Sequence, residues 1–271
     1  MKIPLLIFGL IFSTSSFGQE NKETRIKIKL QLTFLLLLLL SLLTNGLTAQ
    51  TSKNIATQYN GWYMYIGNHR VSEKLSIHTE YQWRRNNWIT NWQQSIIRAG
   101  LDWHVNNSLM LTGGYGWIKS FPYGEQPISF TFNEHRLWQQ LALEHKTGSL
   151  YFHHRYRLEQ RFLESISADI DGNPQRDGYN FRNRARYRFF LAVPLSRSEL
   201  KNNTLFISIY DEVFLGFGKG ISKNILDQNR SYFAIGWRFS NDCNVQLGYL
   251  NHYVIKADGI TMNEIIRCKL V

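Results

Sequence analysis

Arginine and glutamate recur at every second position in two segments of the chain, a spacing that could bind a ligand. Alternate residues of a β-strand face the same side, so each row of charges would form one continuous polar surface. Guanidinium groups stay charged and bind phosphate or carboxylate in a bidentate way, which suits an anion pathway or an anion-binding site. The candidate residues are Arg155, Arg157, Glu159 and Arg161 in one segment, Arg182, Arg184, Arg186 and Arg188 in the next, Glu134 and Arg136 before them, and Glu212 after them.

The same charged rows are also compatible with a purely structural role. Arg and Glu side chains that pair across neighbouring strands can fill the interior of a narrow β-barrel without binding any ligand. The sequence favours this structural role, and it leaves anion binding open as the second interpretation.

Other polar residues do not form a recognisable catalytic or metal site. Asp211 and Glu212 are adjacent, as are His153 and His154, so the members of each pair face opposite sides of a strand. Hydrolysis needs a nucleophile and a base within reach of each other, and these histidines have no clear serine partner. No spacing puts two histidines on one face with an acidic third ligand, among His135, His145, His153 and His154. We therefore predict no enzyme activity, no catalytic residue, no metal and no cofactor.

The charged rows lie on segments that alternate in polarity along their length. In Leu150–Phe162 and Phe181–Val193, one face is mainly aliphatic and aromatic, and the arginines occupy the other face. A helix would scatter these arginines around its circumference, so both segments are predicted strands. The other predicted strands are Trp62–Gly67, Leu75–Trp83, Gln93–Val105, Ser108–Ser120, Asn133–His145, Thr204–Phe217, Arg230–Phe239, Asn244–Ile255 and Met262–Leu270.

Strand length and aromatic residues decide between two all-β architectures. A soluble sandwich would bury the apolar faces, whereas a membrane barrel turns them toward lipid and encloses the polar faces. Most predicted strands run about 10–14 residues, long enough to cross a bilayer at a tilt. Tyr and Trp lie near many strand ends, as in the aromatic girdles of outer-membrane barrels. We therefore predict an all-β fold, a single antiparallel transmembrane β-barrel, with a soluble periplasmic β-protein that binds an acidic ligand as an alternative.

Connection lengths predict the orientation and the strand number. The joints near 68–73, 106–107, 146–149 and 240–243 are short, whereas those at 121–132, 163–180 and 218–229 are long. Outer-membrane barrels have short periplasmic turns and longer outer loops, so the long joints are expected outside. Ten strands follow from Leu75 to the end and two more could precede them, so ten or twelve strands are expected, and eleven does not fit.

The first 49 residues are interpreted as a signal region that is removed. Two stretches follow one another in it, each with a basic start, an apolar middle and a small-residue exit, and the second contains the leucine-rich run Leu32–Leu43. This run is shorter than the roughly 20 apolar residues of a spanning helix, although a retained membrane anchor is an alternative. The signals predict export, and with the strands they place the protein in the cell outer membrane.

Charge and composition restrict the partners. The signal region holds five of the 31 Lys and Arg residues and two of the 20 Asp and Glu residues, so the predicted barrel domain 50–271 keeps a net charge of +8. Export makes nucleic acid the least expected partner of this basic chain. The expected partners are outer-membrane lipid, and small anionic solutes or lipid phosphates. Only 2 Cys residues exclude a disulfide-dense scaffold and a Cys-based zinc cluster.

Several segments carry a resemblance to a known family. EHRLWQQLALEH (134–145), HRYRLEQRF (154–162), YDEVFLGF (210–217) and DQNRSYFAIGWRF (227–239) stand in this order after the opening stretch 61–84. Together they resemble the domain of unknown function 2490, a family of outer-membrane barrels seen mostly in Bacteroidetes-type bacteria. The resemblance implies location and architecture, and it brings no agreed activity. The chain ends in CKLV, whereas barrel proteins usually close on an aromatic residue.

The function expected from these observations is a structural or passive-transport barrel with an Arg/Glu-rich lumen. An outer-membrane lipid-modifying or hydrolytic enzyme is the second hypothesis. We also expect Cys243 and Cys268 not to form a disulfide, because a turn at Asp258-Gly259 would place Cys268 opposite Tyr249. Cys243 would then lie beyond the end of the partner strand, too far away for a bond that needs Cα atoms within about 7 Å.

Overall fold

The computed structural model describes residues 55–124, 128–219, 221, 225–255 and 261–270. The predicted signal region and the expected turn at Asp258-Gly259 lie outside the described residues. The chain divides into two compact units, Met1–Ser52 and Lys53–Val271, and every described residue belongs to the second. In the described ranges there is no helix that is long and apolar enough to cross a membrane.

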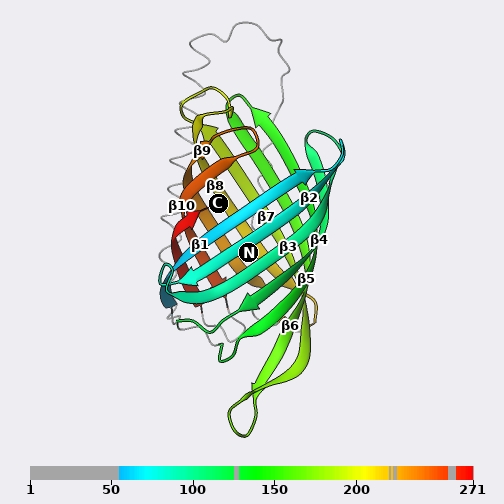
Figure 1. Cartoon of the computed structure of the whole chain (residues 1–271), viewed down its shortest axis with the longest axis vertical. Coiled ribbons are helices and arrows are strands. Elements are labelled where there is room, and N and C mark those ends of the chain that lie inside the picture. The colour runs from blue at the N-terminus through cyan, green and yellow to red at the C-terminus, as the bar shows by residue number, and fades with distance from the viewer. Residues whose placement is uncertain (1–54, 125–127, 220, 222–224, 256–260, 271) are drawn as a thin grey trace, which may run out of the picture. The chain divides into compact units, whose positions relative to one another are not determined.

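The described part of the chain folds into eleven β-strands. They are β1 (Ile55–Arg70), β2 (Leu75–Asn86), β3 (Asn91–His104), β4 (Leu109–Ser120), β5 (Phe132–Thr147), β6 (Leu150–Ala168), β7 (Pro174–Pro194), β8 (Thr204–Phe217), β9 (Leu226–Arg238), β10 (Asn244–Ile255) and β11 (Thr261–Leu270). Each strand pairs with the next, and β11 pairs with β1, so the sheet closes into a barrel (Figure 1). The prediction of an all-β fold with a single barrel is confirmed.

The strand number differs from the expected ten or twelve. Ten neighbouring pairs of strands are antiparallel, whereas β1 and β11 run parallel to each other. A barrel made only of antiparallel pairs needs an even number of strands, but one parallel pair allows an odd number to close. The expected strand number was derived from connection lengths on the assumption that all neighbouring strands are antiparallel. That assumption excludes an odd number, whereas the described residues form eleven strands.

One connection that was expected to be long is a hairpin of strands. β6 and β7 extend into segment 163–180 and leave only the turn 169–173 between them. The Asp169 carboxylate accepts a hydrogen bond from the backbone N–H of Asn173 at 2.7 Å, and Gly172 has a φ of +81°, which favours glycine. These residues therefore form a tight turn in place of the long joint that was expected at 163–180. The hairpin projects beyond the other strands at one end of the barrel (Figure 1).

The connections alternate between the two ends of the barrel. The end that we call the turn end carries 71–74, 105–108, 148–149, 195–203 and 239–243, and the other, the loop end, carries 87–90, 121–131, 169–173 and 218–225. The β6–β7 hairpin thus projects from the loop end. The connections 121–131 and 218–225, both expected to be long, lie at this end as well.

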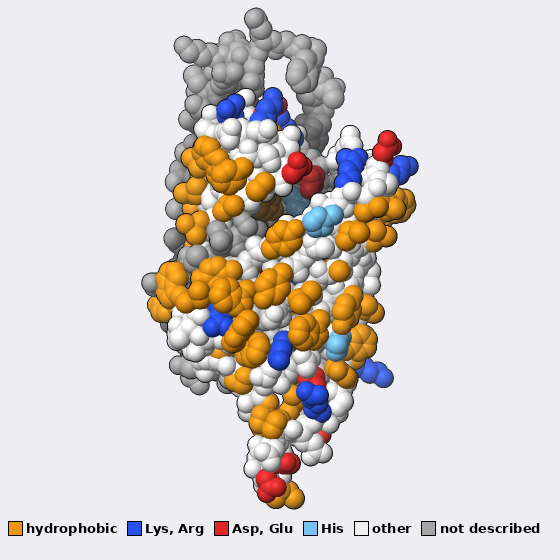
Figure 2. Space-filling model, viewed as in Figure 1, with side chains coloured by type: hydrophobic (Ala, Val, Ile, Leu, Met, Phe, Trp, Pro, Cys, Tyr) orange, Lys and Arg blue, Asp and Glu red, His pale blue; other side chains and the backbone are white. Residues whose placement is uncertain are grey.

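The barrel buries polar side chains and exposes apolar ones. Among the described residues, 22 polar or charged side chains are buried, against 13 hydrophobic ones. On β6 and β7, Tyr156, Leu158, Phe181 and Tyr187 keep between 37% and 50% of their surface exposed, and the arginines between them face the interior. Figure 2 shows hydrophobic side chains spread over the outer face of the barrel. Soluble proteins show the opposite distribution, because charged residues are rarely fully buried.

The final hairpin lies within one residue of the predicted register, because the pairing shifts by one residue between Gly248 and Leu250. Gly248 pairs with Lys269 and Leu250 pairs with Ile266, so the backbone of Cys268 falls between these pairs, beside Tyr249. Cys243 lies before β10 in the exposed turn 239–243 and is a free cysteine. The register therefore separates the two cysteines along the hairpin as expected.

Candidate functional site

Glu159, near the middle of β6, is held by three arginines inside the barrel. Its oxygens accept hydrogen bonds from Arg184 and Arg186, with a shortest distance of 2.6 Å for each guanidinium, and Arg136 lies 3.4 Å away. The Glu159 side chain is only 1% exposed. The neighbouring strands β5 and β7 supply these arginines. Residues that pair across adjacent strands point to the same side of the sheet, so these side chains also face the interior. The buried carboxylate is thus compensated by charge-assisted hydrogen bonds.

The network continues from Glu159 toward the loop end. Glu134 of β5 accepts hydrogen bonds from Arg136 at 2.6 Å and from Arg161 at 2.7 and 2.9 Å. Asp227 of β9 accepts one from Arg184 at 3.0 Å, across the intervening strand β8. We call Glu134, Arg136, Glu159, Arg161, Arg184 and Asp227 the loop-end layer. Within it, each of the three guanidiniums has a carboxylate partner.

Two further carboxylates inside the barrel, Glu212 and Glu80, also accept hydrogen bonds from arginines. Glu212 of β8 accepts hydrogen bonds from Arg186 at 2.7 Å and from Arg155 at 2.5 Å. Glu80 of β2 accepts one from Arg98 of β3 at 2.6 Å. Arg186 contacts both Glu159 and Glu212, so it links this region to the loop-end layer.

Trp138 of β5 lies across the inner face of two neighbouring strands. A Cβ atom built on Gly114 of β4 would come within 2.6 Å of the Trp138 ring, and one on Gly100 of β3 within 3.0 Å. Glycine at these two positions therefore gives the indole the room to reach His78 of β2, at 5.5 Å between ring centroids. The guanidinium of Arg157 lies over the Trp138 ring, 4.4 Å from its centroid.

The indole of Trp62, on β1, also lies inside the barrel and contacts side chains from β3 and β9. Trp62 of β1 is 1% exposed and donates from its Nε1 to Gln93 of β3 at 2.8 Å. The guanidiniums of Arg84 and Arg230 lie 3.6 and 5.0 Å from its ring centroid. Since these contacts join strands that are not neighbours in the sheet, side chains occupy much of the interior.

A cavity of about 220 Å³, which we call the arginine cavity, lies inside the barrel beside the Glu212 and Glu80 ion pairs. Seven arginines and two glutamates are among its lining residues. The charged lining residues are Arg84, Arg98, Arg155, Arg157, Arg186, Arg188, Arg230, Glu80 and Glu212, and they are accompanied by His153, Phe190 and Tyr210.

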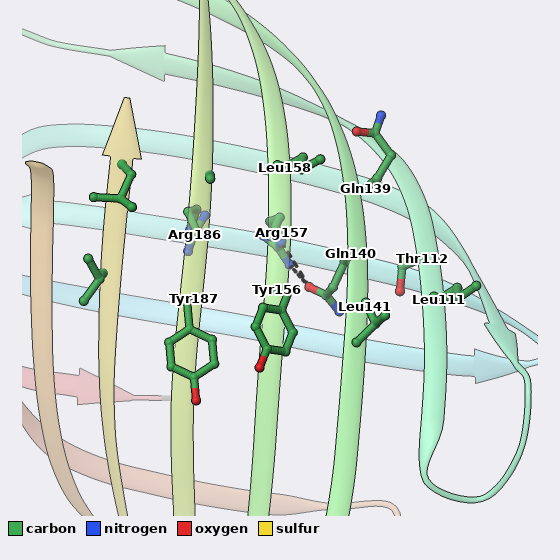
Figure 3. Close-up of a pocket in the computed structure, with 13 residues that line it drawn as sticks. Leu111, Thr112, Gln139, Gln140, Leu141, Tyr156, Arg157, Leu158, Arg186 and Tyr187 are labelled. Atoms are coloured by element: carbon green, nitrogen blue, oxygen red, sulfur yellow. Dashed lines mark hydrogen bonds between the residues drawn. The ribbon is translucent and has the colours of Figure 1, made fainter. Parts of the chain in front are cut away.

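The outer surface of β4–β8 carries a larger and mainly apolar groove of about 760 Å³. Tyr156 and Tyr187 project side by side from β6 and β7 in Figure 3, with ring centroids 4.9 Å apart. Arg157 follows Tyr156 along β6 and therefore points to the opposite side of the strand, where it donates hydrogen bonds to Gln140 inside the barrel. The groove therefore belongs to the apolar outer face and not to the charged interior.

The structure places all eleven residues predicted from the sequence on the inner face of the barrel. Eight of them form the ion pairs described above: Glu134, Arg136, Arg155, Glu159, Arg161, Arg184, Arg186 and Glu212. Arg157 binds Gln140, Arg188 contacts His153, and Arg182 lies half-buried opposite Arg161. Whether they bind a ligand stays a prediction.

Sequence reasoning missed five charged residues of the network and the cavity wall, and Arg84 of β2 is one of them. Glu80 shares β2 with Arg84, and Arg98 shares β3 with Asp102, but neither strand carries a row of arginines. Asp227 and Arg230 lie within the DQNR stretch of β9. The alternation of β2 and β3 could have placed Glu80 and Arg98 on the inner face. As predicted, Glu212 is buried inside while the adjacent Asp211 is exposed. In the described ranges, no group of three or more His, Cys, Asp or Glu residues could hold a metal ion.

The connection between β7 and β8 is tied to the turn-end part of the hairpin formed by β5 and β6. Glu199 accepts hydrogen bonds from Lys146 at 2.7 Å and from Lys201 at 2.8 Å. These ammonium groups lower the pKa of Glu199 to about 2. The backbone N–H of Leu200 donates to the Tyr151 hydroxyl at 3.0 Å, so the connection lies against the turn end of the barrel.

Comparisons with known proteins identify the family and bring no activity. The family model described as a protein of unknown function (DUF2490) matches residues 59–263. The uncharacterized protein MexAM1_META1p0181 of Methylorubrum extorquens is 24% identical over 201 residues, which cover 72% of this chain and 79% of that protein. No solved structure matches the chain. The chain therefore belongs to the DUF2490 family of proteins of unknown function.

Proposed function

We propose that the protein is an outer-membrane β-barrel with a structural role, whose interior side chains prevent the free passage of solutes. The observation that carries this proposal is the inverted distribution of side chains, with charges buried inside and apolar residues outside. Outer-membrane barrels alternate in this way, because their outer face meets lipid and their lumen is polar. A soluble periplasmic protein would leave this apolar surface in water at a cost of about 25 cal/mol per Å².

Two outward-facing aromatic clusters support a membrane position. Near the loop end, Trp92 lies 6.1 Å from Trp83 and 5.3 Å from Phe121, between ring centroids. Near the turn end, Phe152 lies 4.8 Å from His145 and 6.1 Å from Phe189. Aromatic rings prefer the two membrane–water interfaces, so such clusters suit the two borders of an apolar band.

The packed interior supports a structural role over passive transport. Ion pairs cross β8 from Arg184 to Asp227, and Trp138 crosses two strands to reach His78. Glu159, Arg184 and Trp138 are each 4% exposed or less, so water has little access to this level of the lumen. An open channel needs a continuous polar path, which these contacts interrupt.

The location is tested by fractionation of cells that express the full chain, followed by refolding into phosphatidylcholine vesicles. We expect the protein in the outer-membrane fraction and a stable barrel in the vesicles. Leu158→Arg should lower the free energy of unfolding in vesicles by about 2–4 kcal/mol, because it places a charge in the middle of the apolar band. Leu195→Arg, just after β7 at the turn end, is the matched control and should cost at most about 1 kcal/mol.

Equal and small effects of both variants, or a soluble periplasmic protein, would contradict the membrane location. Recording in a planar bilayer separates the structural role from transport: the proposal expects no steady conductance, and regular conductance steps would favour a passive channel. The expectation that the barrel is not an enzyme stays a prediction.

A further inference from the structure

The arginine cavity contains more positive charge than the carboxylates in its wall compensate. Glu80 is bound by Arg98, and Glu212 is shared between Arg155 and Arg186. These three ion pairs use the two glutamates that line the cavity. The remaining lining arginines therefore depend on other groups for their hydrogen bonds.

Three of these arginines, Arg157, Arg188 and Arg230, have no ion-pair partner among the described residues. Arg157 donates to the amide oxygen of Gln140, and Arg230 donates to that of Gln228. Arg188 reaches only Nδ1 of His153, at 3.3 Å, which is a neutral and weak acceptor. The Nε atoms of Arg155, Arg188 and Arg230 are buried without a hydrogen-bond partner among the described residues. Buried donors of this kind are costly unless a further group satisfies them.

The register brings like charges together along the wall of the cavity. Arg155 of β6 lies directly opposite Arg188 of β7, and Arg157 lies directly opposite Arg186. Like charges at opposite positions of neighbouring strands repel each other. Glu212 lies opposite Arg188 and Arg230 in the register, but its ion pairs go to Arg155 and Arg186, so one carboxylate faces four guanidiniums. An anion between the two strands would satisfy the free donors and remove the repulsion.

The size of the cavity limits the ligand to a small group. Its volume of about 220 Å³ corresponds to about seven water molecules at about 30 Å³ each. Pockets for drug-sized ligands usually measure about 300–1,000 Å³. An inorganic oxyanion, or one charged group of a larger molecule, fits this space better than a complete organic metabolite.

The cavity is accessible from the turn end. Ile66 of β1 lines it and keeps 48% of its surface exposed, on the inner face opposite Glu80. A second cavity of about 380 Å³, at the turn end, shares His153 and Phe190 with it. Phe190 and His153 pack edge to face at 6.4 Å between ring centroids. These two rings therefore stand at the inner entrance, and a ligand can arrive without crossing the loop-end layer.

We propose that the arginine cavity binds a phosphate group, with Arg155, Arg157 and Arg188 as its main ligands and His153 at the entrance. Guanidiniums from two strands face one space, so an anion with more than two acceptor oxygens uses them better than a carboxylate does. This inference goes beyond the structural role and does not depend on membrane location. The phosphate could be free in solution or part of a lipid headgroup.

The test is calorimetric titration of the full chain, in a zwitterionic detergent and phosphate-free buffer, with inorganic phosphate. We expect saturable binding and a phosphate-dependent rise in the melting temperature. Arg188→Gln should weaken binding about tenfold or more, because it removes charge-assisted hydrogen bonds. Without phosphate, this variant should melt at the same temperature as the wild type or higher, since it removes an uncompensated charge. Arg176→Gln, on the exposed part of β7, is the matched control and should bind like the wild type.

Two results would overturn the proposal: no saturable binding by the wild type, or unchanged affinity in Arg188→Gln. A lower melting temperature of Arg188→Gln without phosphate would also overturn it, because that result assigns the arginine to the packing of the fold. The source of the phosphate is tested in phosphatidylcholine vesicles with and without phosphatidic acid. Competition by phosphatidic acid supports a lipid headgroup as ligand, and unchanged binding supports free phosphate.

Discussion

The loop-end layer and the arginine cavity use the same residue types but differ in charge balance. In the loop-end layer, three carboxylates meet three guanidiniums at distances from 2.6 to 3.4 Å. In the arginine cavity, seven arginines share two glutamates around an open volume of about 220 Å³. The first region is therefore complete without a ligand, whereas the second lacks acceptors.

This difference shows why a row of arginines does not by itself indicate a binding site. Arg184 and Arg188 lie four residues apart on the inner face of β7. Arg184 contacts Glu159 and Asp227, whereas Arg188 contacts only the neutral nitrogen of His153 among the described hydrogen-bonding groups. The carboxylates on neighbouring strands decide which arginine is structural and which is available to an anion.

The largest effect is expected from removing a charge in the balanced region. Glu159→Gln should lower the free energy of unfolding by about 3 kcal/mol, because it leaves buried guanidiniums without their shared carboxylate. This loss of stability lies at the low end of the range for breaking a buried ion pair, because Arg184 and Arg186 each keep a second acidic partner. Urea unfolding in detergent measures it. Glu73→Gln, in an exposed turn, is the control and should change the free energy of unfolding by less than about 0.5 kcal/mol. An equal effect of both variants would contradict the prediction that the buried Glu159 stabilises the fold.

A smaller effect is expected where packing supports the cavity wall. Gly114→Ala would place a methyl group within 2.6 Å of the Trp138 ring and of the carbonyl oxygen of Ala99. Such overpacking should cost about 1–3 kcal/mol in urea unfolding. Because Arg157 stacks on this indole, the variant should also weaken phosphate binding. Gly113→Ala is the control, since a Cβ atom there meets nothing within 4 Å. Equal losses in both variants would show that Trp138 does not need the space.

Removing a charge from the cavity should cost little. Arg157→Met keeps the packing volume and removes a buried guanidinium without an acidic partner among the described residues. Replacement of buried charges by apolar residues is often neutral or stabilising. We therefore expect the free energy of unfolding to fall by no more than about 1 kcal/mol. A loss as large as that of Glu159→Gln, under the same urea conditions, would remove the distinction between the two regions.

The sequence predicts faces and local pairing well, and long-range contacts poorly. The alternation in β6 and β7 correctly puts Arg184 and Arg186 inside, because side-chain direction follows from the strand period alone. The contact between Arg184 and Asp227 joins β7 to β9, so it depends on the register of two strand pairs. The parallel closure of β1 on β11 has no signal in the periodicity either. Such features arise only when the whole sheet closes.

The smallest effect concerns the entrance side of the cavity, where Glu199 holds the β7–β8 connection. Hydrogen bonds from Lys146 and Lys201 lower the pKa of Glu199 from its usual 4.5 to about 2. A lowered pKa means that the ionised carboxylate stabilises the folded connection at pH values above about 4.5, and that this contribution is lost as the pH falls through about 2. The Leu200 N–H, which donates to Tyr151, should therefore lose hydrogen-exchange protection over this window. Glu199→Gln should show low protection that does not change with pH, and a pH dependence equal to that of the wild type would assign the effect to another group.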